Sequence, residues 1–172
     1  TTELKAILPR LLNEHGKIAK FDATFFEKAN EEDARRLWLF APEHGGIFMD
    51  WIHPLTILVH VLKAELKRMD NLKTYIVRPE YDDVNPTAVQ VRYDIDGDNF
   101  VKDAAVEVRV GKGFDMESDK KTIRLVFEDG AILDLDYLST EEEFSTGKRG
   151  SWKLSKLDGE KVKILESSSV EG

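Results

Sequence analysis

Residues 89–95 read Val89-Gln90-Val91-Arg92-Tyr93-Asp94-Ile95, and this stretch decides the fold class. Apolar and polar side chains alternate in it with a period of two, which is typical of a strand with one buried and one solvated face. Strands of this kind belong to antiparallel sheets that are covered on one side only. The stretch therefore predicts an antiparallel sheet with a wet outer face.

The same alternation recurs further along the chain. It predicts strands around residues 106–110, 123–127, 133–137, 152–154 and 162–164. Asp129-Gly130 and Asp158-Gly159 separate neighbouring strands, and glycine supplies the positive φ that a tight hairpin turn needs. A third pair, Asp96-Gly97, fits a longer loop. We therefore expect six or seven strands in hairpin order within residues 73–166.

The residues before this sheet show helical spacing instead. Apolar side chains recur every three or four residues in segments that predict helices at about residues 4–15, 23–40 and 54–69. We predict a single α+β domain spanning residues 1–172. In it, three N-terminal helices (residues 1–72) pack on one face of a six- to seven-stranded antiparallel meander sheet (73–166), and a frayed tail follows (167–172).

The chain is acidic, and its charge is unevenly placed. The formal net charge is −8, of which residues 1–72 carry −1 and the remainder −7. A negative field repels nucleic acid and anionic membranes, no apolar run reaches the ~18 residues of a membrane span, and the start lacks a secretory signal layout. We expect a soluble, cytoplasmic protein. Its expected partner is another protein, a second copy of the chain included, rather than nucleic acid or a membrane.

Motifs of catalysis are scarce. The sequence contains neither a Gly-x-Ser-x-Gly elbow nor a GxxxxGK[ST] phosphate loop, and it has no cysteine. Asp134 and Asp136 share the wet face of a predicted strand and could perform acid–base chemistry on a sugar. Solvated strand faces carry such residues for solubility as well, so the pair alone does not indicate an enzyme. We expect no cofactor.

Three of the four histidines, His44, His53 and His60, fall within seventeen residues. Together with Asp50 they resemble the ligand set of zinc or non-haem iron. His53 and His60 are seven residues apart, which corresponds to about 10 Å along a helix, too far for both to bind one ion. We therefore predict no metal site. His44, Asp50 and His53 are the residues that come nearest to a set of metal ligands, and they are weak candidates.

The segment 41–54 is the least regular apolar part of the chain. Its Pro and Gly residues forbid a continuous helix, yet Ile47, Phe48, Met49 and Trp51 are too apolar for an exposed loop. These residues either fill the core or form a contact patch, since interface centres favour aromatic residues and Met. The leading hypothesis is a non-enzymatic acidic protein-interaction module, such as an inhibitor, immunity-type or assembly/regulatory factor.

The alternative is a small enzyme or ligand binder. Its pocket would lie between the third helix and the sheet, lined by Trp51, His53, His60 and Tyr93, with metal assistance through the histidines as one version. A deep cavity with a histidine or carboxylate at its floor would favour this alternative. A concavity filled by core side chains would exclude a pocket at that place.

Overall fold

The computed structural model describes residues 2–28, 51–62, 70–76, 88–95, 100–113, 119–137 and 150–168. These residues form two helical segments and eight strands. The helical segments are α1 (Thr2–His15) and α3 (Ile52–Thr56), the latter continuing as the π-helical turn η4 (Ile57–Val61). The strands are β1 (Ile18–Lys28), β2 (Asp70–Ile76), β3 (Ala88–Ile95), β4 (Val101–Gly113), β5 (Lys120–Phe127), β6 (Ile132–Asp136), β7 (Ser151–Asp158) and β8 (Lys161–Ser167).

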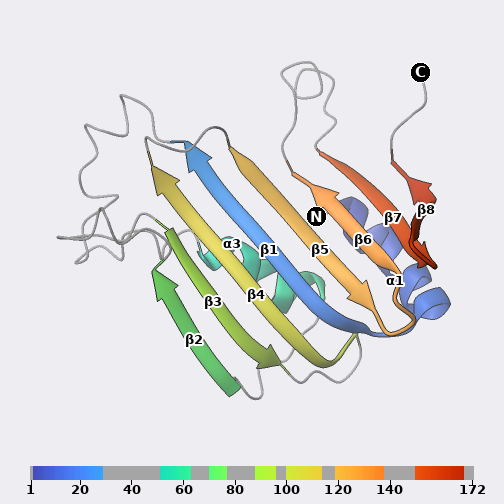
Figure 1. Ribbon diagram of the computed structural model, residues 1–172, viewed down its shortest axis with the longest axis horizontal. Coiled ribbons are helices and arrows are strands. Elements are labelled where there is room, and N and C mark those ends of the chain that lie inside the picture. Colours follow the sequence, from blue (N-terminus) through green and yellow to red (C-terminus); the bar gives the residue numbers. More distant parts are fainter. Residues whose placement is uncertain are drawn as a thin grey trace.

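All eight strands join one sheet in the order β2-β3-β4-β1-β5-β6-β7-β8 (Figure 1). β1 lies in the middle, parallel to β4 and antiparallel to β5. The other neighbouring pairs are antiparallel. The predicted antiparallel meander is therefore wrong. A strand from the N-terminal part of the chain is inserted between β4 and β5, which makes the sheet mixed.

The prediction of three N-terminal helices is also wrong. The predicted helix over residues 23–40 begins inside β1, where Phe21, Ala23 and Phe25 are buried on one face with a period of two. Residues 29–40 of that predicted helix lie outside the described residues. The first predicted helix corresponds to α1, and the third corresponds to α3 and η4 as far as residue 62.

The two helical segments cover the same face of the sheet, behind it in Figure 1. Leu4, Leu8 and Leu11 of α1 and Leu58 and Leu62 of the second segment belong to one buried cluster with the inward side chains of the strands. Each of these five leucines is at most 1% exposed. The core is thus a single layer between helices and sheet, and neither described helix covers the opposite face.

The predicted strands downstream of residue 88 are confirmed. Asp129-Gly130 joins β5 to β6 and Asp158-Gly159 joins β7 to β8, and both glycines have positive φ, +83° and +63°. Asp96-Gly97 lies outside the described residues. Within the described part of the chain, no helix is both long and apolar enough to cross a membrane.

Gly150, directly before β7, combines two restrictions. Its φ is +73°, and a Cβ at this position would lie 2.0 Å from the backbone oxygen of Asp136. Gly159 has a comparable φ, but a Cβ there would meet nothing within 4 Å. We expect Gly150→Ala to lower the free energy of unfolding by at least about 2 kcal/mol, because the backbone segments at Gly150 and Asp136 must move apart to admit the Cβ. Gly159→Ala should cost only about 1 kcal/mol for its φ. Equal losses in urea unfolding would contradict this difference.

Asp129 ties α1 to the sheet. Its Oδ2 lies 3.0 Å from His15 Nδ1 at the end of α1 and accepts a 2.8 Å hydrogen bond from Lys156 Nζ of β7. Its Oδ1 accepts a 2.9 Å hydrogen bond from the Ala131 N–H. Burial alone would raise the pKa of Asp129, but these hydrogen bonds outweigh it and hold that pKa well below its usual range.

A depressed carboxylate pKa stabilises the fold above the unfolded-state value of about 3.9 and loses this effect as the pH falls towards the folded-state value. We expect Asp129→Asn to lower the free energy of unfolding by about 1 kcal/mol at pH 7. The difference from the wild type should shrink below about pH 4. Asp158→Asn, in the other Asp-Gly turn, is the matched control. A pH-independent difference in urea unfolding would contradict the assignment.

Candidate functional site

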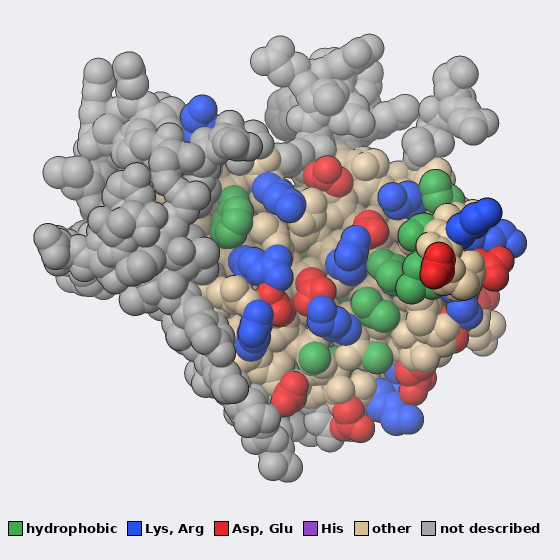
Figure 2. Space-filling view, in the orientation of Figure 1, with side chains coloured by type: hydrophobic (Ala, Val, Ile, Leu, Met, Phe, Trp, Pro, Cys, Tyr) green, Lys and Arg blue, Asp and Glu red, His purple; other side chains and the backbone are tan. Residues whose placement is uncertain are grey.

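The open face of the sheet carries the polar side chains of the strands. On β1, Phe21 and Phe25 point to the helices, whereas Asp22 and Thr24 alternate with them and point to the open side. Figure 2 views this face and shows Lys and Arg side chains interspersed with Asp and Glu over the middle of the sheet. Opposite charges are thus in reach of one another across several strands.

The strand register arranges these side chains in two rows. The charged row crosses the sheet from β3 to β7 through Arg92, Glu107, Asp22, Arg124, Asp134 and Lys153. The hydroxyl row runs beside it from β4 to β7 through Arg109, Thr24, Thr122, Asp136 and Ser151. Directly opposite residues in a sheet share one face, so each row is a continuous line of side chains.

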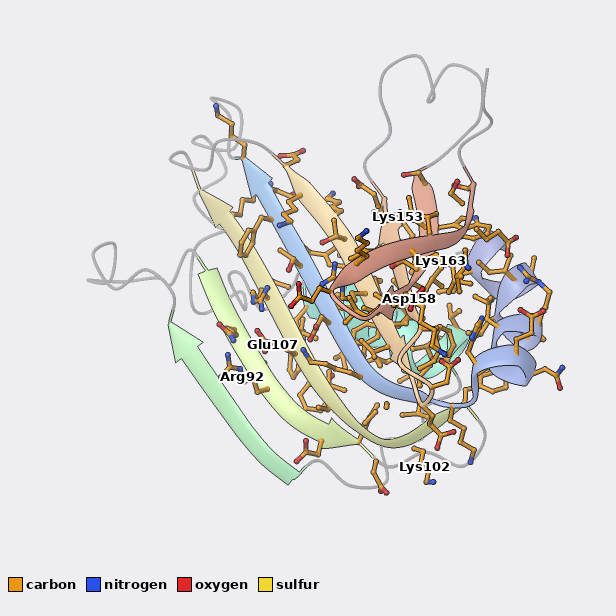
Figure 3. The ribbon with its side chains drawn as sticks, turned by 45° about the vertical axis from the view of Figure 1, so that its right-hand side comes forward. Arg92, Lys102, Glu107, Lys153, Asp158 and Lys163 are labelled. Atoms are coloured by element: carbon orange, nitrogen blue, oxygen red, sulfur yellow. The ribbon has the colours of Figure 1, made fainter. Side chains whose placement is uncertain are left out.

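Most of the charged row is internally paired. Arg124 donates two hydrogen bonds to Asp134, of 2.6 Å and 3.2 Å, in a fork-like arrangement. Glu107 accepts a hydrogen bond of 3.1 Å from Arg92, its neighbour in Figure 3, and a further one from Arg109. Arg109 also lies 3.4 Å from the Thr24 hydroxyl. These contacts fix the guanidinium groups in place.

The pairing shifts two pKa values. Burial alone would raise the pKa of Glu107, but the hydrogen bonds and charges of Arg109 and Arg92 outweigh it, so that the pKa is lowered. The hydrogen bond to Asp134 raises the pKa of Arg124 above its ordinary value, although burial acts in the opposite direction. Both residues therefore stay charged at neutral pH.

A hollow of about 720 Å³ lies over these rows. Its floor is formed by the hydroxyl row and by Asp22, Arg124, Asp134 and Lys153, and Lys120 also lines it. Ile164 and Ser167 of β8 contribute to its wall. In agreement, the β7–β8 hairpin lies in front of the open face in Figure 3, with Lys153, Asp158 and Lys163 labelled on it.

One carboxylate oxygen of Asp22 lacks a hydrogen-bond partner among the described residues. Its Oδ2 accepts a 2.8 Å hydrogen bond from Lys20, but its Oδ1 is buried and has no hydrogen-bond partner within the described part of the chain. A buried acceptor without a partner costs about 1–3 kcal/mol. Carboxylates accept, guanidinium groups donate and threonine hydroxyls do both. The hollow therefore offers donors and acceptors side by side to a small polar molecule.

The four residues predicted to line a pocket between the third helix and the sheet are placed as a packed pair and two exposed histidines. Trp51 packs edge-on against Tyr93, with ring centroids 6.4 Å apart, and Tyr93 is only 2% exposed. Burial raises the pKa of Tyr93. His53 and His60 are exposed, and the core packs on this side of the sheet. The structure therefore brings Trp51 and Tyr93 together but leaves both histidines on the surface.

Other predicted site residues stay untested. Ile47, Phe48 and Met49 of the predicted contact patch lie outside the described residues, as do His44 and Asp50 of the weak metal candidates. Among the residues that the structure describes, no group of three or more His, Cys, Asp or Glu side chains is placed to hold a metal ion.

Sequence reasoning missed most of the hollow. Asp134 and Asp136 were recognised as a pair on a wet strand face, and both line it. Thr24 falls in the predicted helix over residues 23–40 and Asp22 directly precedes it, while Arg109 and Arg124 are polar positions of predicted strands. The alternation signalled their outward orientation, but only the register of β1 brings them together.

Glu107 offers a test of the charged row. Its side chain is 14% exposed and lies between Arg92 and Arg109. Glu107→Gln should lower the free energy of unfolding by about 1 kcal/mol at pH 7, because two arginines lose their shared counter-charge. Since the folded-state pKa is depressed, the difference should diminish as the pH falls below the unfolded-state value of about 4.3. If the free energy of unfolding of Glu107→Gln at pH 7, measured by urea unfolding, equals that of the wild type, the pairing is contradicted.

Comparisons with known proteins give the fold its context. Neither a family model nor a curated protein matches the sequence. An inositol dehydrogenase homolog from Azotobacter vinelandii, solved with NAD+, is similar with a TM-score of 0.61 and 16% identity, over 96% of this chain and 40% of its own. A protein described as an oxidoreductase from Erwinia carotovora atroseptica has a TM-score of 0.61 at 12% identity, over 94% and 45%. A dehydrogenase from Chromobacterium violaceum is similar with a TM-score of 0.53 and 13% identity, over 92% of this chain and 39% of its own.

These likenesses concern the fold. The chain spans less than half the length of the three proteins, and nearly all of it matches. Its mixed sheet thus has the fold of a part of dehydrogenase-type oxidoreductases. The hypothesis of a non-enzymatic protein-interaction module, an inhibitor or regulatory factor, is therefore wrong, and the enzyme or ligand-binder alternative is better supported.

Proposed function

We propose that this chain is a substrate-binding domain of dehydrogenase type, and that a polyhydroxylated small molecule binds in the hollow on its open face. The observation that carries the proposal is the hollow itself. Its volume of about 720 Å³ is within the range of small-molecule sites, roughly 300–1,000 Å³. Its floor alternates carboxylate, guanidinium and hydroxyl groups, which suits a ligand with several hydroxyls.

One of the named neighbours supports this ligand class. It is an inositol dehydrogenase homolog, and inositol is a ring of six secondary alcohols. In the proposed complex, the Asp22 carboxylate turns so that Oδ1, buried without a ligand, faces the hollow and accepts a hydrogen bond from one ligand hydroxyl. Thr24 and Thr122 of the hydroxyl row bind neighbouring hydroxyls as donors or acceptors. Arg124, held by Asp134, presents its remaining N–H groups from a fixed position.

The residues of this hollow do not fit a nicotinamide dinucleotide. Dinucleotide sites commonly place the pyrophosphate at a helix N-terminus that follows a Gly-x-Gly-x-x-Gly turn. The sequence has no such turn, and both described helices lie on the other face of the sheet (Figure 1). The proposal therefore assigns substrate binding to this chain and derives no hydride transfer from it. The cytoplasmic location and a protein partner, a second copy included, stay predictions.

The proposal is tested with two ring alcohols of equal ring size. We expect myo-inositol, followed by ¹H–¹⁵N correlation spectra of the 172-residue chain, to shift the amide signals of Thr24, Thr122 and Arg124 in a saturable manner. Cyclohexanol, which has the same ring but a single hydroxyl, should not. If myo-inositol and other polyols leave these signals unchanged, or if cyclohexanol acts equally, the hollow is not a polyol site.

A variant locates the binding. Asp22→Asn should weaken myo-inositol binding about tenfold, because a hydrogen bond to a charged acceptor contributes roughly 1.5–3 kcal/mol. Lys102→Gln is the control, since Lys102 pairs with Glu128 at the far end of β4 (Figure 3). If the two variants bind myo-inositol with equal affinity, the ligand does not contact Asp22.

A further inference from the structure

The hollow is positively charged within an acidic protein. Four cationic side chains, of Arg109, Lys120, Arg124 and Lys153, line it against the three carboxylates of Asp22, Asp134 and Asp136. The chain as a whole carries −8. The local excess of one positive charge is therefore a property of this place and not of the surface in general.

The two arginines are already engaged, and the two lysines are not. Arg109 binds Glu107 and Thr24, and Arg124 binds Asp134. Lys153 stands directly opposite Asp134 in the register, but both oxygens of Asp134 are used by Arg124. Within the described part of the chain, neither the Lys120 nor the Lys153 side chain has an ion pair or a hydrogen bond.

The two lysines stand on opposite sides of the hydroxyl row. Lys120 lies on β5, one same-face position beyond Thr122, whereas Lys153 lies on β7 in the charged row. Two strand spacings of about 4.8 Å and four residues of about 3.3 Å rise separate their Cα atoms by roughly 16 Å. Two flexible four-carbon stems with an anion between them can span such a distance.

We propose, building on the proposed function, that the ligand of the hollow is an anionic polyol whose carboxylate or phosphate group is held between Lys120 and Lys153. The lysines act as point charges on the anionic group, while the hydroxyl row and Asp22 bind the hydroxyls of the same molecule. Asp22 then has a hydroxyl donor, and both uncompensated cations have a counter-charge. A large polyanion is disfavoured by the negative charge of the rest of the chain.

The apolar wall of the hollow suits a ligand with a small carbon skeleton. Ile164 lines the wall and is 59% exposed, and its neighbours Leu157 and Val162 on the same hairpin are 60% and 64% exposed. Of these side chains, Ile164 lies in the hollow and can pack against the C–H groups of a polyol chain. An inorganic anion would use the lysines but neither this wall nor Asp22.

The test compares three ligands with the same six-carbon skeleton by calorimetric titration of the full 172-residue chain. D-Glucitol is neutral, D-gluconate carries a carboxylate, and D-glucitol 6-phosphate carries a phosphate. Exposed ion pairs are individually weak, and two of them should make the preferred anionic ligand about two- to thirtyfold tighter than glucitol. Whichever of the two anionic ligands shows this gain identifies the anionic group.

Variants show whether the lysines cause the gain. In the double variant Lys120→Gln/Lys153→Gln, the anionic ligand should bind no more tightly than glucitol does to the same variant. Lys163→Gln, on the same hairpin but outside the hollow, should retain the gain. Equal affinity of the neutral and both anionic ligands, or a gain that survives in the double variant, would overturn this inference and leave the polyol site intact. Failure of all three ligands, with myo-inositol, would overturn the proposed function as well.

Discussion

The insertion of β1 between β4 and β5 is the constraint on which the rest of the structure depends. β1 pairs along nearly its whole length with both neighbours, in opposite directions. Because side chains alternate along a strand, this single element delivers Phe21 and Phe25 to the core and Asp22 and Thr24 to the open face. Without it, β2–β4 and β5–β8 would be two separate antiparallel units, each with a further unpaired edge. The core and the hollow therefore share one cause.

How much of this was predictable from the sequence depends on the range of the interactions. The strands from residue 88 onward and the turns at Asp129 and Asp158 are encoded within a few residues, by alternation and by glycine with positive φ, and they were predicted. β1 was not, because the run Phe21 to Phe26 contains apolar residues at both periods and is followed by charged residues typical of helices. Local propensity cannot distinguish these alternatives when the parallel partner strand lies 83 to 85 residues away in the sequence.

The candidate site was less predictable than the fold for the same reason. Asp22 becomes a neighbour of Arg124 and Asp134 only through the register of β1 with the β5–β6 hairpin, which lies far from β1 in the sequence. Each of the three residues by itself reads as an ordinary solvated residue. The sequence drew attention to His53 and His60 instead, because clusters of histidine along a chain are conspicuous. Their exposure on the helical side shows that closeness in sequence is no substitute for convergence of side chains.

The energetics of the open face separate stabilising groups from those available for binding. Arg92, Glu107, Arg109, Arg124 and Asp134 satisfy one another, so removing one of them leaves a partner uncompensated and lowers stability. Lys120, Lys153 and the Oδ1 atom of Asp22 have no such partners in the described residues. Removal of the two lysine side chains should change the free energy of unfolding little. The buried Oδ1 of Asp22, which lacks a hydrogen bond, destabilises the fold when no ligand is bound. The pairing holds the arginines in fixed positions, so a ligand that binds their remaining N–H groups costs less conformational entropy there. The two lysine side chains, in contrast, lose conformational freedom when the ligand binds.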